Sequence, residues 1–204
     1  SNVLDKGFIK LLETFGDELT IVNAARVSFG NTKTSFDEKD KKLVKFLWKH
    51  KHYSPFRHVM YRFHIKAPEF VMRQWYKHVV GIETSSTYPT KDHAWNEISG
   101  RYKEVVDYYN PTSWRSQSKD SKQGSGENLN TEKSKHATEI FQSHMIQTVE
   151  RYEELIKLGV AKEEARIILP LNQYTEVIWT CSLQALLNFF ELRNKPDSQY
   201  EIRE

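Results

Sequence analysis

The sequence contains very little cysteine, and this scarcity excludes several kinds of site. The single cysteine, Cys181, permits no disulfide within the chain and no cysteine cluster around a metal ion. It lies in the apolar stretch VIWTCSL with no basic residue beside it, which predicts a buried and unreactive thiol. Catalysis by a cysteine nucleophile is therefore not expected. The histidine spacing matches no specific metal-ligand signature, so no metal site is predicted either.

Long apolar runs and several common motifs are also missing. No segment approaches the roughly 20 apolar residues of a membrane span. The chain opens with no charged-then-apolar leader, so we expect a cytoplasmic protein without membrane contact. Neither GxGxxG nor GxxxxGK[ST] occurs, so the sequence predicts neither a dinucleotide-binding turn nor a P-loop. GxSxG is also absent, so no nucleophile elbow is predicted.

The remaining composition is that of an ordinary globular chain. Of its 204 residues, 38% are hydrophobic and 28% are charged, which suits one domain, residues 1–204, with a buried core. The net charge of +3 suits an anionic ligand. Because the basic residues are scattered and the aromatic residues fit a core, no nucleic-acid surface is predicted.

Hydrophobic periodicity predicts strands and helices in mixed order. Strands are expected at 3–16 (with a turn), 58–68 and 173–182, and helices at 17–30, 37–52, 68–79, 131–159, 161–170 and 183–193. In the strand at 58–68, one face is formed by Val59, Tyr61, Phe63 and Ile65, and the other by Met60, Arg62, His64 and Lys66.

Two segments lack this periodicity and are predicted to be loops. Residues 79–95 contain Gly81, Pro89 and a Ser/Thr cluster. Residues 110–130 are polar and rich in glycine and serine. Because the second segment also holds Trp114 and Arg115, we interpret it as a mobile loop that covers a substrate.

The segment NEISGRY, residues 96–102, concentrates donors and acceptors. Gly100 lets a backbone approach closely, Ser99 supplies a hydroxyl, and Arg101 supplies a planar fork for phosphate. A nucleotide is the most economical ligand for this set. A purely structural alternative remains for Arg166, which could form a surface ion pair with Glu163.

Six motifs in order suggest a family. They are NAARVSF, KHKHYSPFRH, FHIKAPEFVMRQW, NEISGRY, ARIILPLNQYT and LLNFFELR. Together they span almost the whole chain, which therefore resembles the flavin-dependent thymidylate synthases. The resemblance implies an α+β fold with a central, mainly antiparallel sheet flanked by helices. It also implies a homotetramer whose active sites lie between subunits.

The resemblance further implies an activity: reductive methylation of dUMP to dTMP. FAD would be the cofactor, with NADPH and methylenetetrahydrofolate as co-substrates. The expected dUMP-binding residues are Gln74, Lys77, Glu97, Ser99, Gly100, Arg101, Arg166 and Arg193. The expected FAD-binding residues are His52, Ser54, Lys77, His78, Val79, Asn96, Glu97, Ser182, Gln184 and Asn188. Arg193 and Ser99 are the expected catalytic residues, with Arg193 polarising the uracil ring.

The chain departs from the family pattern at one motif. The family reads Arg-His-Arg where this chain has Lys77-His78-Val79. Lysine keeps the first charge without the planar fork, and valine loses the second charge. Two alternatives therefore stay open. One is flavin-dependent modification of another pyrimidine nucleotide, and the other is a nucleotide-binding homologue that has lost catalysis.

Overall fold

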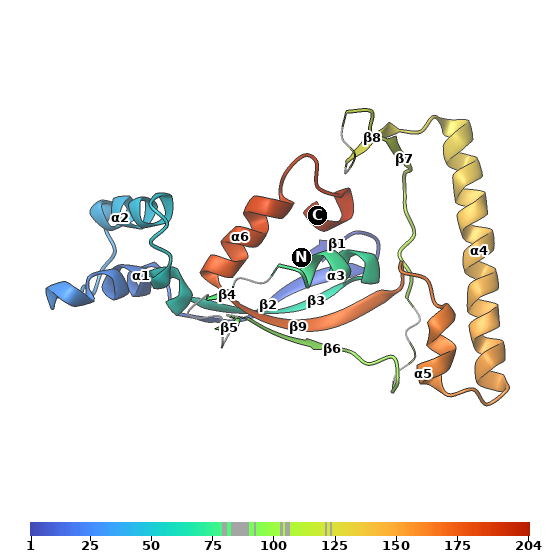
Figure 1. The fold of residues 1–204 in the computed structure, drawn as a ribbon, viewed down its shortest axis with the longest axis horizontal. Coiled ribbons are helices and arrows are strands. Elements are labelled where there is room, and N and C mark those ends of the chain that lie inside the picture. The colour runs from blue at the N-terminus through green and yellow to red at the C-terminus, as the bar shows by residue number, and fades with distance from the viewer. Residues whose placement is uncertain are drawn as a thin grey trace.

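A computed structural model describes residues 1–78, 81–82, 90–91, 93–102, 104, 107–120, 122 and 124–204. Its centre is an antiparallel sheet of five strands in the order β1-β2-β3-β9-β6. These strands are β1 (Asn2–Val3), β2 (Gly7–Phe15), β3 (Met60–Pro68), β9 (Tyr174–Ser182) and β6 (His93–Glu97). The expected α+β class and antiparallel sheet are confirmed. Figure 1 shows helices on one face of the sheet and at both of its ends.

The predicted alternation along β3 is confirmed by its neighbours on each face. Ile65 is buried in the main core under the helices. On the other face, Arg62 Nη1 donates to Glu13 Oε2 at 2.5 Å, and His64 Nε2 lies 3.0 Å from Glu176 Oε2. A strand with one buried and one polar face fixes its register, because a slip by one residue would exchange the two faces.

The main core lies between the sheet and three helices, α3 (Glu69–Trp75), α6 (Leu183–Arg193) and α7 (Tyr200–Arg203). Trp179 of β9 is 1% exposed and stands at the centre of an aromatic group. Its ring stacks on Trp95 at 5.0 Å and meets Trp75 edge-on at 5.4 Å. Burying a side chain of this size contributes roughly 3 kcal/mol, so this core anchors α3 and α6 on the sheet. The short α7 was not predicted from the sequence.

A second, smaller core joins the helices at one end of the sheet (Figure 1). These are α1 (Glu18–Ala25), α2 (Glu38–Lys49) and the 3₁₀ turns η1 (Val27–Phe29) and η2 (Ser54–His58). The single helix predicted for 17–30 is wrong beyond Ala25, where a 3₁₀ turn follows and ends at Gly30. Gly30 has a φ of 68°, a left-handed conformation that glycine adopts without strain.

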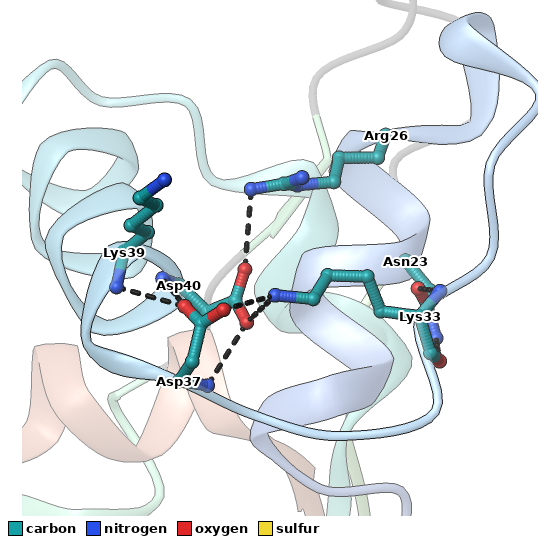
Figure 2. A network of polar contacts seen from close by, with 6 residues as sticks. All are labelled: Asn23, Arg26, Lys33, Asp37, Lys39 and Asp40. Carbon is teal, nitrogen blue, oxygen red and sulfur yellow. Dashed lines mark hydrogen bonds and ion pairs between the residues drawn. The ribbon is translucent and has the colours of Figure 1, made fainter.

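A buried carboxylate holds the segment between α1 and α2 (Figure 2). Asp40 is fully buried and pairs with Arg26, whose Nη2 donates to Oδ1 at 3.1 Å, and with Lys33. Its Oδ2 also accepts the backbone N–H of Asp37 at 3.0 Å. Asn23 binds both backbone groups of Lys33, through Oδ1 at 2.8 Å and Nδ2 at 3.0 Å. This network fixes the path of residues 30–37 against α1.

The far end of the sheet carries α4 (Thr131–Lys157), α5 (Lys162–Ala165) and the 3₁₀ turn η3 (Arg166–Ile168) (Figure 1). The helix predicted for 131–159 is confirmed, and only Met145, Thr148 and Tyr152 of α4 are buried. A 27-residue helix with so few buried side chains is largely unpartnered within one chain. None of the helices in the described part of the chain is long and apolar enough to cross a membrane.

Both predicted loops contain strands. Residues 110–130 hold a hairpin of β7 (Arg115–Gln117) and β8 (Ser125–Asn128), tied to α7 by Arg115 Nη2, which donates to Glu201 at 2.8 and 3.0 Å. Residues 79–95 hold the pair β4 (Gly81–Ile82) and β5 (Thr90–Lys91), and the start of β6. Pairing with β9 makes a strand where the local pattern was too short to predict one. Residues 79–80, 83–89 and 92 lie outside the described part.

Candidate functional site

A polar cavity of about 250 Å³ lies where β6, the start of α3 and η3 meet. Of the predicted site residues, Glu97, Gly100 and Arg166 line it together. Three elements far apart in the sequence therefore meet at one cavity, as the nucleotide hypothesis requires. Ser99 and Arg101 flank Gly100 in the chain, and Ser99 Oγ accepts the backbone N–H of Arg101 at 3.2 Å.

The backbone at Gly100 approaches the Arg166 side chain closely. A Cβ atom built at Gly100 would lie 3.5 Å from Arg166 Cδ and 3.6 Å from Arg166 Nη1. The glycine backbone and the guanidinium thus form one wall of the cavity. Such a wall offers a planar cation beside an accessible peptide, which suits a phosphate group.

Two glutamates and a threonine also line the cavity. Glu97 is the last residue of β6, and its Oε1 accepts a hydrogen bond from Thr175 Oγ1 at 2.7 Å. Glu69 is the first residue of α3, and its backbone N–H donates to Gln173 O at 2.8 Å. The side chains of Glu69 and Glu97 both line the cavity. These contacts place both carboxyl groups in the cavity beside Arg166.

This arrangement makes one carboxyl group weakly acidic. Burial raises the pKa of Glu69 to about 7, and the neighbouring Glu97 adds to the rise. The charges of Arg73 and Arg166 act in the opposite direction without cancelling it. Burial and then Glu97 also raise the pKa of the Tyr76 phenol, which stays protonated at neutral pH. The cavity therefore combines the Arg166 cation with a weakly acidic carboxyl group, that of Glu69.

Arg101 lies at the surface near this cavity. Its Nε donates to Glu163 Oε2 at 3.0 Å, and its guanidinium lies over the Tyr102 ring at 5.8 Å. The alternative that Arg166 pairs with the Glu163 side chain is wrong, since Arg166 Nε donates only to the Glu163 backbone oxygen, at 3.3 Å. Arg101 is exposed and its ion pair is solvated, so the guanidinium can exchange Glu163 for another anion.

A second group of predicted residues gathers at the other end of α3. Gln74 and Arg193 line a cavity of about 550 Å³, and Gln74 Nε2 donates to Gln199 Oε1. Arg193 Nε donates to His78 Nε2, which must therefore be an unprotonated acceptor. Burial and then the Arg193 charge lower the pKa of His78, consistent with a neutral imidazole at pH 7. Lys77 beside it is exposed.

The predicted flavin residues are spread over several elements. His52 and Ser54 are exposed around the start of η2, and Asn96 is exposed on β6. Ser182 is buried and caps α6, where its Oγ accepts the Ala185 backbone N–H at 3.1 Å.

The remaining flavin residues lie on or beside α6. Gln184 is also buried, and its Oε1 accepts a bond from Arg57 Nη1 at 2.8 Å. Asn188 is half-buried, and Val79 lies outside the described residues. In the part of the chain that the structure describes, no group of three or more histidine, cysteine or acidic side chains could hold a metal ion.

The predicted residues do not all gather at one place within the chain: Arg193 meets His78, but the residues around η2 lie apart from Glu97. In the sheet, Ser182 pairs with Met60 next to η2, whereas Glu97 pairs with Val177 toward the opposite end of β9. Thr175, which contacts Glu97, and Ser182 are separated by roughly 24 Å of extended strand. His52, Ser54 and Ser182 therefore lie toward the opposite end of the sheet from Glu97 and Gly100.

Sequence reasoning missed Glu69 and Thr175. Glu69 follows Pro68 at a helix start, where an acidic residue is expected for the helix dipole alone. Thr175 lies in a strand whose alternation explains its burial. Only the contact of both with Glu97 reveals them, and that contact joins segments distant in the sequence.

Comparisons with known proteins cover the whole chain. The family model described as thymidylate synthase complementing protein matches residues 10–204. Flavin-dependent thymidylate synthases of Kosmotoga olearia and Thermus thermophilus are 41% and 42% identical over 99% of this chain, and over 83% and 69% of their own lengths. A solved UMP/dUMP methylase, PolB from Streptomyces cacaoi bound with 5-Br dUMP, is 26% identical with a TM-score of 0.82. That match covers 100% of this chain and 88% of PolB.

Proposed function

We propose that this chain, which belongs to the thymidylate synthase complementing protein family, catalyses the reductive methylation of dUMP to dTMP. The observation that carries the proposal is the wall formed by Gly100 and Arg166 in a polar cavity that Glu97 also lines. Relatives named flavin-dependent thymidylate synthases share 36–42% of the sequence over nearly its full length. The PolB structure, bound with a brominated dUMP, supports a pyrimidine nucleotide as the ligand.

The nucleotide phosphate is proposed to bind at the Gly100–Arg166 wall. Arg166 supplies a planar fork, and Ser99 and Arg101 extend the same surface with a hydroxyl and a second cation. Arg101 would exchange its exposed Glu163 partner for the phosphate. Gln74 and Arg193, at the other end of the seven-residue helix α3, are then available for the base.

Arg193 is proposed to polarise the pyrimidine. Its Nε is occupied by His78, so the terminal nitrogens of the guanidinium remain for the ring oxygen and ring nitrogen. A fixed cation beside the ring stabilises negative charge as it develops, and the His78 contact spares the guanidinium from reorganising during the reaction. Because His78 is neutral, it accepts this bond without adding positive charge.

The exposed polar residues fit a flavin better than the buried ones do. His52, Ser54, Lys77 and Asn96 present donors to solvent, which suits the polar and anionic parts of FAD. Ser182 and Gln184 are buried and bonded within the chain, so we assign them to holding α6 and η2 in place. FAD, when bound, would supply the hydride for the methylation, with NADPH as its reductant and methylenetetrahydrofolate as the carbon donor.

A homotetramer with active sites between subunits completes this proposal. Exposed apolar side chains support it, because surface patches of this kind usually mark contacts with another chain. They occur on β2, η1 and α4 and include Leu11, Leu12, Phe15, Val27, Phe29, Ile140 and Ile146. Assembly would bring the His52 end of one chain toward the Gly100 end of another, which the roughly 24 Å separation along β9 prevents within a single chain.

An anaerobic titration of the FAD-reconstituted protein tests the activity. NADPH is expected to bleach the flavin, and reoxidation is expected only after both dUMP and methylenetetrahydrofolate are added. Mass spectrometry should then find dTMP. A protein that binds dUMP but no flavin at any practical concentration would instead be the nucleotide-binding homologue, with Val79 as the first residue to restore to arginine.

The same assay distinguishes a second substrate. Because PolB is described as a UMP/dUMP methylase, UMP should be offered in parallel with dUMP. Preference for UMP, or a hydroxymethyl rather than a methyl product, would favour modification of another pyrimidine nucleotide or a different one-carbon state over dTMP synthesis.

A further inference from the structure

Gln199 has no role in the proposed reaction, although its side chain lines the Arg193 cavity. Its Oε1 accepts a hydrogen bond from Gln74 Nε2. We propose that Gln199 is a positioning residue, which holds the Gln74 amide in one orientation so that Gln74 binds the pyrimidine. This inference rests on the proposed function, because it takes the cavity to hold the base of the nucleotide.

The Gln74 amide needs a partner to have a defined orientation. It carries an acceptor on one side and two N–H donors on the other, and a half-turn about its last side-chain bond exchanges them. Gln74 is half-buried near the end of α3. Because Gln199 Oε1 can only accept, its hydrogen bond is made with the NH2 side of the Gln74 amide. The carbonyl oxygen and the second N–H of Gln74 are not used by this bond and can bind a ligand in the cavity.

The backbone of Gln199 is anchored through α7, the helix that it precedes. Its carbonyl oxygen accepts the Ile202 N–H at 3.2 Å, and Ile202 is buried in the main core. Glu201 is 8% exposed and accepts two bonds from Arg115 Nη2, at 2.8 and 3.0 Å. Core packing and a buried ion pair therefore hold α7, and with it Gln199, in place.

The residues before Gln199 are held to the end of α6. Ser198 Oγ donates to the Leu192 backbone oxygen at 3.2 Å, and the Ser198 N–H donates to the Lys195 oxygen at 3.0 Å. Leu192 precedes Arg193, so the turn that carries Arg193 also supports Gln199. A side chain that is restrained before binding loses less conformational freedom when the ligand arrives. Gln199 is therefore placed to make Gln74 a better ligand for the base.

Binding of dUMP and of deoxyribose 5-phosphate, which lacks the base, tests this role in the full chain by displacement calorimetry. The ratio of the two Kd values gives the contribution of the pyrimidine, and any effect of the substitution on the phosphate cancels from it. Gln199→Met keeps the length of the side chain and removes the amide acceptor. It should reduce the ratio about three- to tenfold, as expected for one hydrogen bond, while thermal unfolding shows that the protein stays folded.

Two further variants separate positioning from other roles. Gln199→Glu still accepts the Gln74 N–H through a carboxylate, so it should keep the ratio within about twofold of wild type. In a Gln74→Met background, Gln199→Met should change the ratio no further, because Gln199 acts only through Gln74. A general structural role would lower the ratio in either background. Gln142→Met is the matched control, since Gln142 is exposed on α4 at the far end of the sheet, and it should leave the ratio unchanged.

Three results would overturn this inference alone, with dUMP still bound by the wild type. They are a wild-type ratio in Gln199→Met, a loss in Gln199→Glu equal to that in Gln199→Met, and an undiminished effect of Gln199→Met in the Gln74→Met background. If the wild type does not bind dUMP, the proposed function fails and this inference fails with it. If Gln199→Met does not fold, Gln199→Ala takes its place in the same measurements.

Discussion

Replacing Asp40 by alanine should destabilise the chain through the network shown in Figure 2. The Asp40 side chain is 0% exposed and touches two cations, Arg26 and Lys33, whose side chains are 34% and 23% exposed. It also accepts the Asp37 backbone N–H at 3.0 Å. The substitution therefore removes three favourable contacts at once and leaves three donors facing a small void.

The size of the loss follows from how far water can replace these contacts. Breaking a fully buried ion pair costs about 3–5 kcal/mol. Arg26 and Lys33 are partly exposed and can recover some hydration, which places the expected loss near the lower limit, about 3 kcal/mol. For a chain of this length that loss lowers the melting temperature by about 6–12 °C. Asp40→Asn should restore less than half of the stability that Asp40→Ala loses, because the amide nitrogen of asparagine must face a cation.

Thermal and urea unfolding of the two variants measure this effect, and limited proteolysis shows where it acts. Cleavage within residues 30–37 should accelerate more than cleavage elsewhere, since Lys33 loses its buried partner. Glu38→Ala is the control, because Glu38 is 84% exposed and its pair with Lys41 is 3.6 Å long. It should change stability by less than about 0.5 kcal/mol. A shift below about 2 °C for Asp40→Ala would refute the assigned role of the network.

Further predictions concern the site and the core. Arg193→Ala should reduce turnover at least about a hundredfold while the melting temperature stays unchanged, and turnover within twofold of wild type would remove Arg193 from catalysis. Arg101→Ala should weaken the binding of dUMP more than the binding of FAD, as measured by calorimetry. The reverse order would refute the assignment of NEISGRY to the nucleotide site. Trp179→Ala should cost about 3–5 kcal/mol in urea unfolding, because its buried ring contacts several others. Stability should fall as the pH drops below 6.5, because unfolded His78 takes up a proton that the folded state resists, and His78→Asn should reduce that fall.

Strong periodicity explains which elements could be predicted. In β9 buried and half-buried residues alternate from Thr175 to Cys181, and β3 carries the alternating sequence quoted above, so both strands followed from the sequence. The start of β6 did not, because only a few residues precede the polar NEISGRY and the strand exists through its pairing with β9. The β7–β8 hairpin likewise depends on a distant contact, the ion pair between Arg115 and Glu201.

The candidate site could likewise be predicted only in part from the sequence. NEISGRY could be predicted as a binding segment because its hydrogen-bond donors are adjacent in the sequence. The structure places Gly100 of this segment next to the Arg166 side chain. The alternative that paired Arg166 with the Glu163 side chain is wrong, because helical spacing suggests only near neighbours and the observed partner of Glu163, Arg101, lies on another segment. The carboxyl pair of Glu69 and Glu97 could not be predicted at all, since no local pattern relates the two residues.

The two cavities depend on a single short helix, and this links nucleotide binding to the arrangement of Arg193. Glu69 begins α3 in the polar cavity that Arg166 also lines, and Gln74, near the end of α3, lines the Arg193 cavity. The rise from one to the other is about 8 Å. The helix is fixed at its start by the Glu69 N–H bond to Gln173 and near its end by Trp75 in the core. Because neither end can move without breaking these contacts, α3 sets a rigid spacing between the proposed phosphate and base positions. An inserted residue within α3 would therefore disturb both cavities together, whereas a change confined to Arg166 would leave the Arg193–His78 contact intact.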